Sequence, residues 1–325
     1  MDKSSVVILL ATFNGAKYLK KQLNSIINQT HLNWELVIRD DGSNDNTIEI
    51  IKYYEGIDKR ISYIQTQSNI HGACANFSEL YKWTKENKEI EYLMFSDQDD
   101  IWLSNKIEKS MSYLKSSEQK YPNLPILIYS NLKLIDENDD YIKSSIKLLN
   151  NVGFNRIMVQ NYVFGCTTIF NKQLFDLIDY IPKDAENHDY WVALVATAFG
   201  KALLMDDHTI LYRQHASNVT SQGSSLHERY NRYVVNIDKQ LKAFRLKHGM
   251  LHHFLTIYDK KVDASISNMT TKYLESYKKN RFQTLFEIIR YKLYRMGLLQ
   301  TISLFYIILF YYKSVKFEGS GPKSE

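Results

Sequence analysis

The sequence predicts an α/β protein in which a mostly parallel, Rossmann-like sheet flanked by helices is followed by a helical C-terminal region. Short apolar runs alternate with helical patterns up to about residue 100, which is typical of parallel strands joined by right-handed crossovers. From about residue 226 onward only helical spacing remains. The 325 residues are 44% hydrophobic and 24% charged, which indicates a globular chain of one large or two smaller domains.

The first hundred residues predict four strands and three helices. Residues 6–11 are continuously apolar, as in a strand that is buried on both faces. Leu19, Leu23 and Ile26 then form one helical stripe. By the same criteria we expect strands at 6–11, 34–38, 61–64 and 92–95, and helices at 16–29, 46–55 and 75–87.

The rest of the chain is less regular. We expect a helix at 103–120, strands at 126–129 and 167–170, an amphipathic helix at 187–199, and one or two short strands within 203–212. Apolar residues keep helical spacing from 226 to 244 and from 251 to 266. Residues 282–296 are basic and aromatic, 298–312 are uncharged, and 319–325 are predicted to be a flexible tail.

Charge is divided unevenly along the chain. Residues 1–225 contain 23 Lys and Arg against 28 Asp and Glu, whereas residues 226–325 contain 18 against 8. The uncharged run 298–312 is shorter than the roughly 20 residues that span a bilayer, and basic residues flank it. We therefore predict that this region docks on a membrane surface. Packing inside the protein or in a dimer interface is the alternative, and we expect no nucleic-acid partner.

The cysteines and the first residues indicate the compartment. Cys74 and Cys166 have no CxxC spacing and no neighbouring histidine pair, so we expect neither a zinc site nor a disulfide framework. The apolar run at the start is short and lacks a cleavage pattern, so we do not expect a signal peptide. The prediction is a cytoplasmic protein, peripheral on the inner face of the cell membrane.

Three polar clusters follow predicted strands, at residues 12–15, 40–43 and 97–100. Each alone is commonly just a turn, because Asp, Asn, Ser and Gly favour turns. Parallel strands end at one edge of a sheet, and open α/β sheets bind ligands beyond that edge. Three such clusters together therefore predict a ligand site.

The acidic cluster predicts a metal. Asp97 and Asp99 are one residue apart on an extended segment, and a hard divalent cation relieves the repulsion between close carboxylates. Mg²⁺ and Mn²⁺ use few protein carboxylates and complete their shell with water and phosphate. The alternative is that Asp99 and Asp100 stabilise the N-terminus of the helix at 103–120; both interpretations can hold together.

The motifs TFNG, RDDGSNDNT, FSDQDDIWLSNKIEK, GCTTIFN, HDYW and YRQHASN occur in this order. Together they resemble glycosyltransferase family 2, and especially its bacterial rhamnosyltransferase-like branch, over about residues 5–220. The resemblance implies a GT-A fold at 1–225, with a nucleotide-binding half at about 1–100 and an acceptor half at 101–225. The helical, basic region at 226–318 follows. The family transfers sugars from nucleoside diphosphates with inversion, usually with Mg²⁺ or Mn²⁺.

The resemblance also assigns roles on the donor side. Thr12 and Asn14 match positions beside the nucleoside. Asp40 matches the carboxylate that accepts the N3–H of uracil or thymine, which favours UDP or dTDP donors. Asp97 matches the residue nearest the ribose, and Asp99 matches the metal ligand. Arg213 and His215 fall where the family closes a loop over the diphosphate.

On the acceptor side, Asp189 matches the catalytic base. A carboxylate partly removed from water at a helix N-terminus can accept a proton from an acceptor hydroxyl. His188 as the base, or a capping role for Asp189, is the alternative. The other roles open to His188 are an acceptor contact, a pKa tuner and a structural neighbour. Trp102 and Trp191 could stack on a sugar or pack in the core.

The expected activity follows from these assignments. The resemblance implies transfer of L-rhamnose from dTDP-L-rhamnose to a lipid-linked glycan in bacterial cell-surface polysaccharide synthesis. Another UDP or dTDP hexose (galactose, glucose or galactofuranose) is the first alternative. A non-catalytic, membrane-bound carbohydrate-binding module on the same fold is the second. A homo-oligomer is compatible with the sequence.

Overall fold

The structure is a computed structural model that describes residues 4–66, 68–144, 152–215 and 237–315. These residues form two compact units. The first contains the described residues up to 152, together with 162–183 and 187–215; the second contains 153–161, 184–186 and 237–315. The predicted domain boundary at 225 and the predicted tail at 319–325 lie outside the described residues, so this division of the chain stays a prediction.

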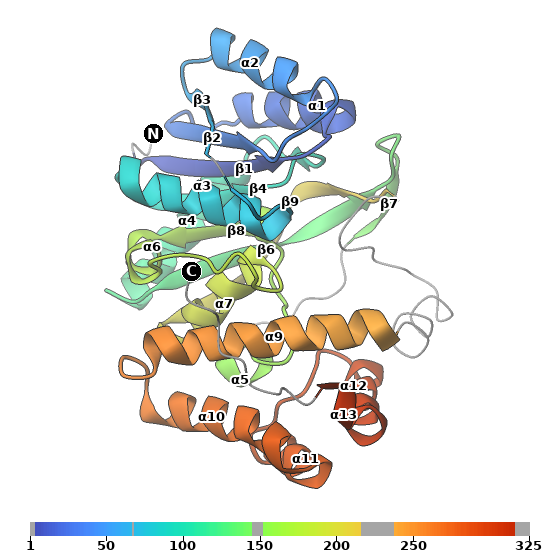
Figure 1. Ribbon diagram of the computed structural model, residues 1–325. Helices are drawn as coiled ribbons and strands as arrows, with labels where there is room; N and C mark the ends of the chain where they lie inside the picture. The colour runs from blue at the N-terminus through green and yellow to red at the C-terminus, as the bar shows by residue number, and fades with distance from the viewer. Residues whose placement is uncertain (1–3, 67, 145–151, 216–236, 316–325) are drawn as a thin grey trace. The chain divides into compact units, whose positions relative to one another are not determined.

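The first unit is built on one nine-stranded sheet. Eight strands run in the order β3-β2-β1-β4-β8-β6-β9-β5, and β7 pairs with β6 (Figure 1). The strands are β1 Val6–Thr12, β2 Trp34–Asp40, β3 Ile61–Ile64, β4 Tyr92–Ser96, β5 Ile101–Trp102, β6 Ile126–Ile135, β7 Tyr141–Ser144, β8 Thr168–Asn171 and β9 Lys201–Arg213. The helices are α1 Ala16–Ile27, α2 Thr47–Ile57, α3 Ala73–Asn87, α4 Lys106–Lys120, the 3₁₀ helix η1 Gly165–Thr167, α6 Lys172–Leu177 and α7 His188–Phe199.

The predicted α/β class is confirmed, and its parallel character is strongest in the first four strands. Strands β1 to β4 all pair in parallel, with Val6 opposite Trp34 on one side and Tyr92 on the other. Beyond β4 the sheet is mixed, because β8 runs antiparallel between β4 and β6, while β9 returns parallel to β6. The carboxyl ends of β1, β2 and β4 therefore meet at one edge.

Alternating side chains of the strands give the sheet two apolar faces. Val6, Ile8 and Leu10 of β1 share one core with buried residues of α1, α2 and α4. Helices α3 and α7 contact each other, and α3 also packs on β1 and β2. Both faces of β1 are covered, which explains its uninterrupted apolar sequence.

Helix α7 is not amphipathic, contrary to the prediction. The seven consecutive residues from Tyr190 to Ala196 are all buried, so every side of the helix faces protein. Its contacts come from β6, β9, η1 and α3. A helix that is apolar all round is typical of a buried position, so burial here follows from tertiary packing.

Strand β9 is one long strand where one or two short strands were predicted. Its register against β6 shifts around Asn131, opposite the polar residues at 206–208. A bulge lets a strand bend and continue after such a polar interruption. The strand consequently extends to Arg213.

The second unit is helical. It contains α5 Phe154–Ile157, α9 Ile237–Tyr258, α10 Ala264–Lys279, α11 Arg281–Arg290, α12 Leu298–Phe310 and α13 Tyr312–Val315. The helical spacing predicted across 251–266 is interrupted, because α9 ends at Tyr258 and the Asp263 side chain caps α10 by accepting from the Ser265 N–H at 2.8 Å. Within the described ranges, no helix is both long and apolar enough to cross a bilayer.

Candidate active site

The loops after β1 and β2 are joined by hydrogen bonds. The Thr12 hydroxyl donates to Asp40 Oδ1 at 2.8 Å, and the Asn14 N–H donates to Ser43 Oγ at 2.7 Å. Asn14 Oδ1 accepts from the Asn44 N–H at 2.9 Å. Asn14 has a φ of 48°, a left-handed conformation that asparagine tolerates better than most residues. Thr12, Asn14 and Asp40 thus lie together, as the sequence predicts.

The loops after β1 and β4 are joined in the same way. Gln98 Oε1 accepts from the Phe13 N–H at 2.9 Å, and Gln98 Nε2 donates to the Phe13 carbonyl at 3.0 Å. A Cβ on Gly15 would lie 2.2 Å from Gln98 Oε1, so a larger residue there would displace the Gln98 side chain from these two hydrogen bonds. Sequence analysis did not identify Gln98 as a site residue; its place between two aspartates after a strand was the available signal.

The Asp40 carboxylate is fully occupied within the loop. Oδ1 accepts from Thr12 and from the Ser43 hydroxyl at 2.5 Å, and Oδ2 accepts from the N–H groups of Gly42 and Ser43 at 3.0 and 2.7 Å. A carboxylate offers about four lone-pair positions. To accept the N3–H of a pyrimidine, Asp40 must therefore exchange one of these bonds for the base.

Behind this loop lies a buried ion pair that the sequence analysis missed. Arg39 NH1 lies 3.2 Å from Asp41 Oδ1 and donates to Asn76 Oδ1 at 2.9 Å. Asp41 Oδ2 accepts from the Gly72 N–H at 2.7 Å. The signal was an arginine that directly follows the apolar run Leu36–Ile38, since a buried charge needs partners. The network fixes the start of α3 against the β2 loop.

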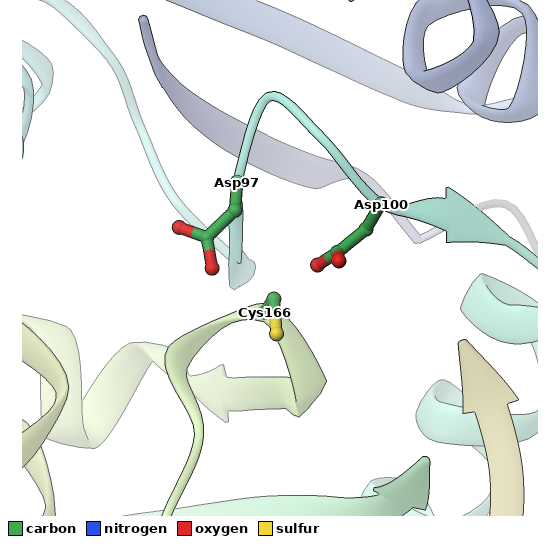
Figure 2. Close-up of side chains that lie close together, drawn as sticks. All are labelled: Asp97, Asp100 and Cys166. Carbon is green, nitrogen blue, oxygen red and sulfur yellow. The ribbon is translucent and has the colours of Figure 1, made fainter. Parts of the chain in front are cut away.

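Asp97 and Asp100 lie on either side of the short loop after β4, close to Cys166 of η1 (Figure 2). Each residue offers one ligand atom, and the three atoms lie within 4.8 Å of one another. From the sequence, Asp97 and Asp99 were the predicted metal residues, and Cys166 was not expected to belong to a zinc site. The aspartates were visible in one motif, but Cys166 is far away in the chain and only the fold brings it near.

The pKa values of the two carboxylates in this cluster are raised. Burial, followed by the charges of Asp99 and Asp189, raises the pKa of Asp97 to about 7. Burial and the charges of Asp99 and Asp97 also raise the pKa of Asp100 well above its ordinary value. A divalent cation favours the charged forms, so these oxygens fit Mg²⁺ or Mn²⁺. The sulfur does not fit Mg²⁺, and burial raises the pKa of the Cys166 thiol, which disfavours a thiolate ligand.

Asp99 has different surroundings from its two acidic neighbours. Its Oδ2 lies 2.8 Å from Nε2 of His215, and the His215 ring stacks on Tyr18 at 5.2 Å between centroids. The structure thus brings together Asp99 and His215, two residues with separately predicted roles. The individual roles of Asp99 and His215 remain predictions.

Arg213 is fully buried and organises the acidic loop. Its Nε donates to the Asp99 carbonyl at 2.8 Å, and its backbone N–H donates to Asp100 Oδ1 at 3.0 Å. NH1 donates to the Asp136 carbonyl at 3.0 Å and pairs with the Asp139 carboxylate. This placement favours a role in holding the loop at 97–100; the predicted contact with diphosphate remains a prediction.

Asp189 is half-buried in the first turn of α7. Its Oδ2 accepts from the Gly165 N–H at 2.8 Å. A Cβ on Gly165 would lie 2.7 Å from His188 Nε2, so glycine permits the close approach of η1 and α7. The Asp189 charge contributes to the raised pKa of Asp97, which places the predicted base within electrostatic reach of the acidic cluster.

The three predicted acceptor contacts are buried. His188 stacks on Phe77 at 3.7 Å between ring centroids and meets the edge of Phe95 at 4.7 Å. Burial lowers the His188 pKa to about 3, so the ring is neutral at physiological pH. Trp102 and Trp191 are also buried. This burial favours the packing alternative for all three, and an acceptor role for any of them stays a prediction.

The chain is similar to a known protein family and to several named relatives. Residues 7–131 match the family described as Glycosyl transferase family 2. The chain is 25% identical to the putative teichuronic acid biosynthesis glycosyltransferase TuaG of Bacillus subtilis, over 51% of this chain and 62% of TuaG, so it spans less than two thirds of that relative. It is 28% identical to the dTDP-rhamnosyl transferase RfbG of Shigella flexneri, over 69% of this chain and 77% of RfbG.

Solved structures agree on the fold. TarS 1–349 of S. aureus, in complex with UDP-GlcNAc, has a TM-score of 0.57 at 15% identity, covering 88% of this chain and 80% of that one. The mannosyltransferase PcManGT from Pyrobaculum calidifontis, in complex with GDP-Man and Mn²⁺, has a TM-score of 0.53 at 12% identity, covering 95% and 82%. At these identities the likeness concerns the fold alone. Residues 7–131 of this chain therefore match glycosyltransferase family 2, and the sheet that contains them has the GT-A fold.

Proposed function

We propose that this chain is an inverting, metal-dependent glycosyltransferase that moves a sugar from a nucleoside diphosphate to a hydroxyl group of a glycan. The observation that carries the proposal is the position of the acidic cluster. Asp97 and Asp100 lie at the carboxyl edge of the parallel strands, beside two loops that hydrogen bonds join to each other. Open α/β sheets bind nucleotides at this edge.

The metal site uses the carboxylates of the loop after β4. Asp97 and Asp99 are the proposed ligands, and the position of Asp100 makes it a further candidate. Bound Mg²⁺ or Mn²⁺ supplies positive charge that stabilises the departing diphosphate. Arg213 keeps the loop in place through the Asp99 carbonyl and the Asp100 carboxylate. His215 orients Asp99 through the contact at 2.8 Å.

Asp189 is the proposed catalytic base. Inversion requires a base on the face of the sugar opposite the leaving diphosphate, within reach of the acceptor hydroxyl. The Gly165 N–H holds the Asp189 carboxylate through Oδ2. Neutral His188 packs against Phe77 and Phe95, so it supports the start of α7 and leaves the proton transfer to Asp189.

The proposed donor is dTDP-L-rhamnose and the proposed acceptor is a lipid-linked glycan of a bacterial surface polysaccharide. The similarity to RfbG, which is named as a dTDP-rhamnosyl transferase, supports this donor. A UDP-hexose is the second candidate, because the chain is also 26% identical to an Escherichia coli enzyme, WfgD, named as a UDP-Glc:alpha-D-GlcNAc-diphosphoundecaprenol beta-1,3-glucosyltransferase. That name also supports a lipid-linked acceptor. With such an acceptor, the proposed location is the cytoplasmic face of the membrane.

A panel of nucleotide sugars with Mn²⁺ tests the proposal. The release of nucleoside diphosphate from dTDP-rhamnose, UDP-glucose, UDP-galactose and GDP-mannose is measured with the parent and with Asp189→Asn. We expect dTDP-rhamnose to be used best. Because Asp40 is proposed to accept a pyrimidine N3–H, dTDP should also compete better than GDP. Equal competition would refute that role, and no release from any donor would favour the non-catalytic alternative.

A further inference from the structure

Helix α11 exposes several apolar residues on one side. Phe282, Phe286 and Ile289 are 72%, 55% and 55% exposed, and their spacing puts them on one stripe of the helix. The buried side of the helix contains two polar residues, Thr284 and Glu287, together with Ile288. A surface helix normally has polar residues outside and apolar residues inside. The exposed stripe therefore resembles a contact surface.

Helix α12 adds apolar surface beside it. Leu304, Ile307 and Ile308 are fully buried against the rest of the unit, yet Leu298, Ile302 and Phe310 are 78%, 52% and 70% exposed. The helix is apolar on both sides, although only one side is covered. Helices α11 and α12 contact each other, and Arg281 NH1 of α11 donates to the Leu309 carbonyl of α12 at 2.7 Å. We call Phe282, Phe286, Ile289, Leu298, Ile302 and Phe310 the α11–α12 face.

The charges around this face have one sign. Residues 278–315 contain one acidic residue, Glu287, which is buried beside Arg290. The basic residues of the same segment are Lys278, Lys279, Arg281, Arg290, Lys292, Arg295 and Lys313. All are exposed except Arg295, which is half-buried. Tyr306 packs on Phe310 at 5.0 Å, and tyrosine is enriched at the boundary between lipid and water.

We propose that the α11–α12 face binds the surface of an anionic lipid bilayer, with both helices lying in the interface. The apolar side chains enter the acyl boundary, and the basic side chains contact lipid phosphates. The 13 residues of α12 cover about 20 Å at 1.5 Å per residue, less than the roughly 30 Å hydrocarbon core, so the helix lies along the membrane. A second copy of the chain would bring the same positive charges against this face, which disfavours self-association there.

The inference rests on the proposed function for its purpose, because a lipid-linked acceptor keeps transfer at a membrane. The binding itself is measured without donor or acceptor, so its failure and the failure of the transferase proposal are separate results. The full chain is sedimented with vesicles of phosphatidylcholine alone or mixed with phosphatidylglycerol, at low and at high salt. We expect binding to the mixed vesicles that weakens as salt increases.

A matched pair of double variants locates the surface. Phe286→Ser with Ile302→Ser removes two apolar side chains from the α11–α12 face, and we expect the partition coefficient to fall by about tenfold or more. Tyr53→Ser with Ile57→Ser changes two residues of α2 that are similarly exposed, at 63% and 60%, and should bind like the parent. All four positions are exposed, so circular dichroism should show folded protein in each case.

A fluorescence measurement distinguishes insertion from a protein contact. Phe286→Trp places an indole on the face, and brominated acyl chains should quench it more than they quench the parent tryptophans. The proposal is overturned if the parent ignores phosphatidylglycerol vesicles at low salt, or if Phe286→Ser with Ile302→Ser binds as the parent does. Equal binding to both vesicle types would also overturn it. So would a parent dimer that this double variant dissociates, since the face would then join two copies.

Discussion

Asp99 and Asp100 are neighbours in the chain, but their side chains have different surroundings. Asp99 is half-buried and contacts His215, whereas Asp100 is fully buried and accepts the Arg213 N–H. Asp97 lies near Asp100 and Cys166. In this acidic motif, the Asp99 carboxylate is accessible to a ligand, whereas the Asp100 carboxylate is hydrogen-bonded to the end of β9. The exchange of single residues can separate these roles.

The first prediction concerns the metal. Asp99→Asn should remove most transferase activity, and excess Mn²⁺ should not restore it, because the variant lacks the ligand charge. Removal of a residue that only hydrogen-bonds to a metal ligand typically lowers activity by about 10–100-fold, and the decrease in Asp99→Asn should be larger. Asp100→Asn, at the further candidate ligand, is measured alongside, and Mn²⁺ affinity is followed in a titration calorimeter. Near-normal activity of Asp99→Asn in a metal-chelated assay would refute the role of Asp99.

The second prediction concerns the base. Asp189→Asn should leave nucleotide binding nearly intact and lower turnover by about 10²–10⁴-fold, the usual scale for general-base catalysis. Turnover and donor affinity are measured separately. His188→Ala, measured alongside, should instead reduce stability by about 2–3 kcal/mol, because it removes a buried ring that packs against Phe77 and Phe95. A donor-affinity loss equal to the turnover loss would mean that Asp189 shapes the donor site.

At the scale of elements, helix α9 places a histidine, His248, in an aromatic core. His248 is buried among Phe244, Tyr273 and Tyr277, with ring centroids 4.7, 5.7 and 4.3 Å away. Burial, followed by the charges of Lys247 and His252, lowers the His248 pKa to about 3. The Lys247 Nζ donates to the Val159 carbonyl at 2.9 Å, so this turn of α9 is held from two sides.

The third prediction is a pH dependence of stability. An unfolded histidine takes up a proton below its ordinary pKa of about 6.5, but folded His248 stays neutral down to about 3. The free energy of unfolding therefore falls as the pH decreases through this window. Between about pH 7 and pH 5, His248 should account for about 2 kcal/mol of this loss. Urea unfolding followed by circular dichroism measures it.

His248→Phe is the comparison for this experiment. The free energy of unfolding of His248→Phe at about pH 7, compared with that of the parent, gives the cost of repacking the core. Its smaller decrease toward about pH 5 gives the contribution of His248 protonation, which this variant lacks. An equal pH dependence in the parent and in His248→Phe would contradict the prediction. His188 adds the same dependence in both proteins, because burial lowers its pKa to about 3 as well.

At the scale of the whole molecule, the two units differ in their aromatic content. The four tryptophans of the chain, at positions 34, 83, 102 and 191, belong to the first unit. The second unit has a core rich in tyrosine, with Tyr258, Tyr273 and Tyr277 fully buried. Tryptophan fluorescence therefore reports the unfolding of the unit that contains the candidate active site.

The fourth prediction uses this difference. dTDP with Mn²⁺ should raise the midpoint of the unfolding transition seen by tryptophan fluorescence, because a ligand that binds only the folded state stabilises it. The gain is about 2.7 kcal/mol when the ligand is at 100 times its Kd. GDP with Mn²⁺ is the control and should raise the midpoint less. A tryptophan transition that dTDP and Mn²⁺ leave unchanged would contradict a donor site in this unit.

Local patterns in the sequence determined much of this architecture. Strands β1 to β4, the helices between them and the three polar clusters at their ends were all predicted, because burial on two faces and helical stripes leave short-range periodicities. The order of the clusters in one parallel sheet also predicted that Thr12, Asn14 and Asp40 would lie together. The uncharged run around α12 likewise indicated an unusual surface.

Tertiary structure decided what depends on distant segments. The insertion of β8 between β4 and β6 brings Cys166 to Asp97 and Asp100, and the long β9 brings His215 to Asp99. Packing against α3 and the sheet buries α7 on every side. No local periodicity encodes these contacts, because each joins residues that are far apart in the chain. Such residues come together only when the whole sheet has formed and its helices have packed on it.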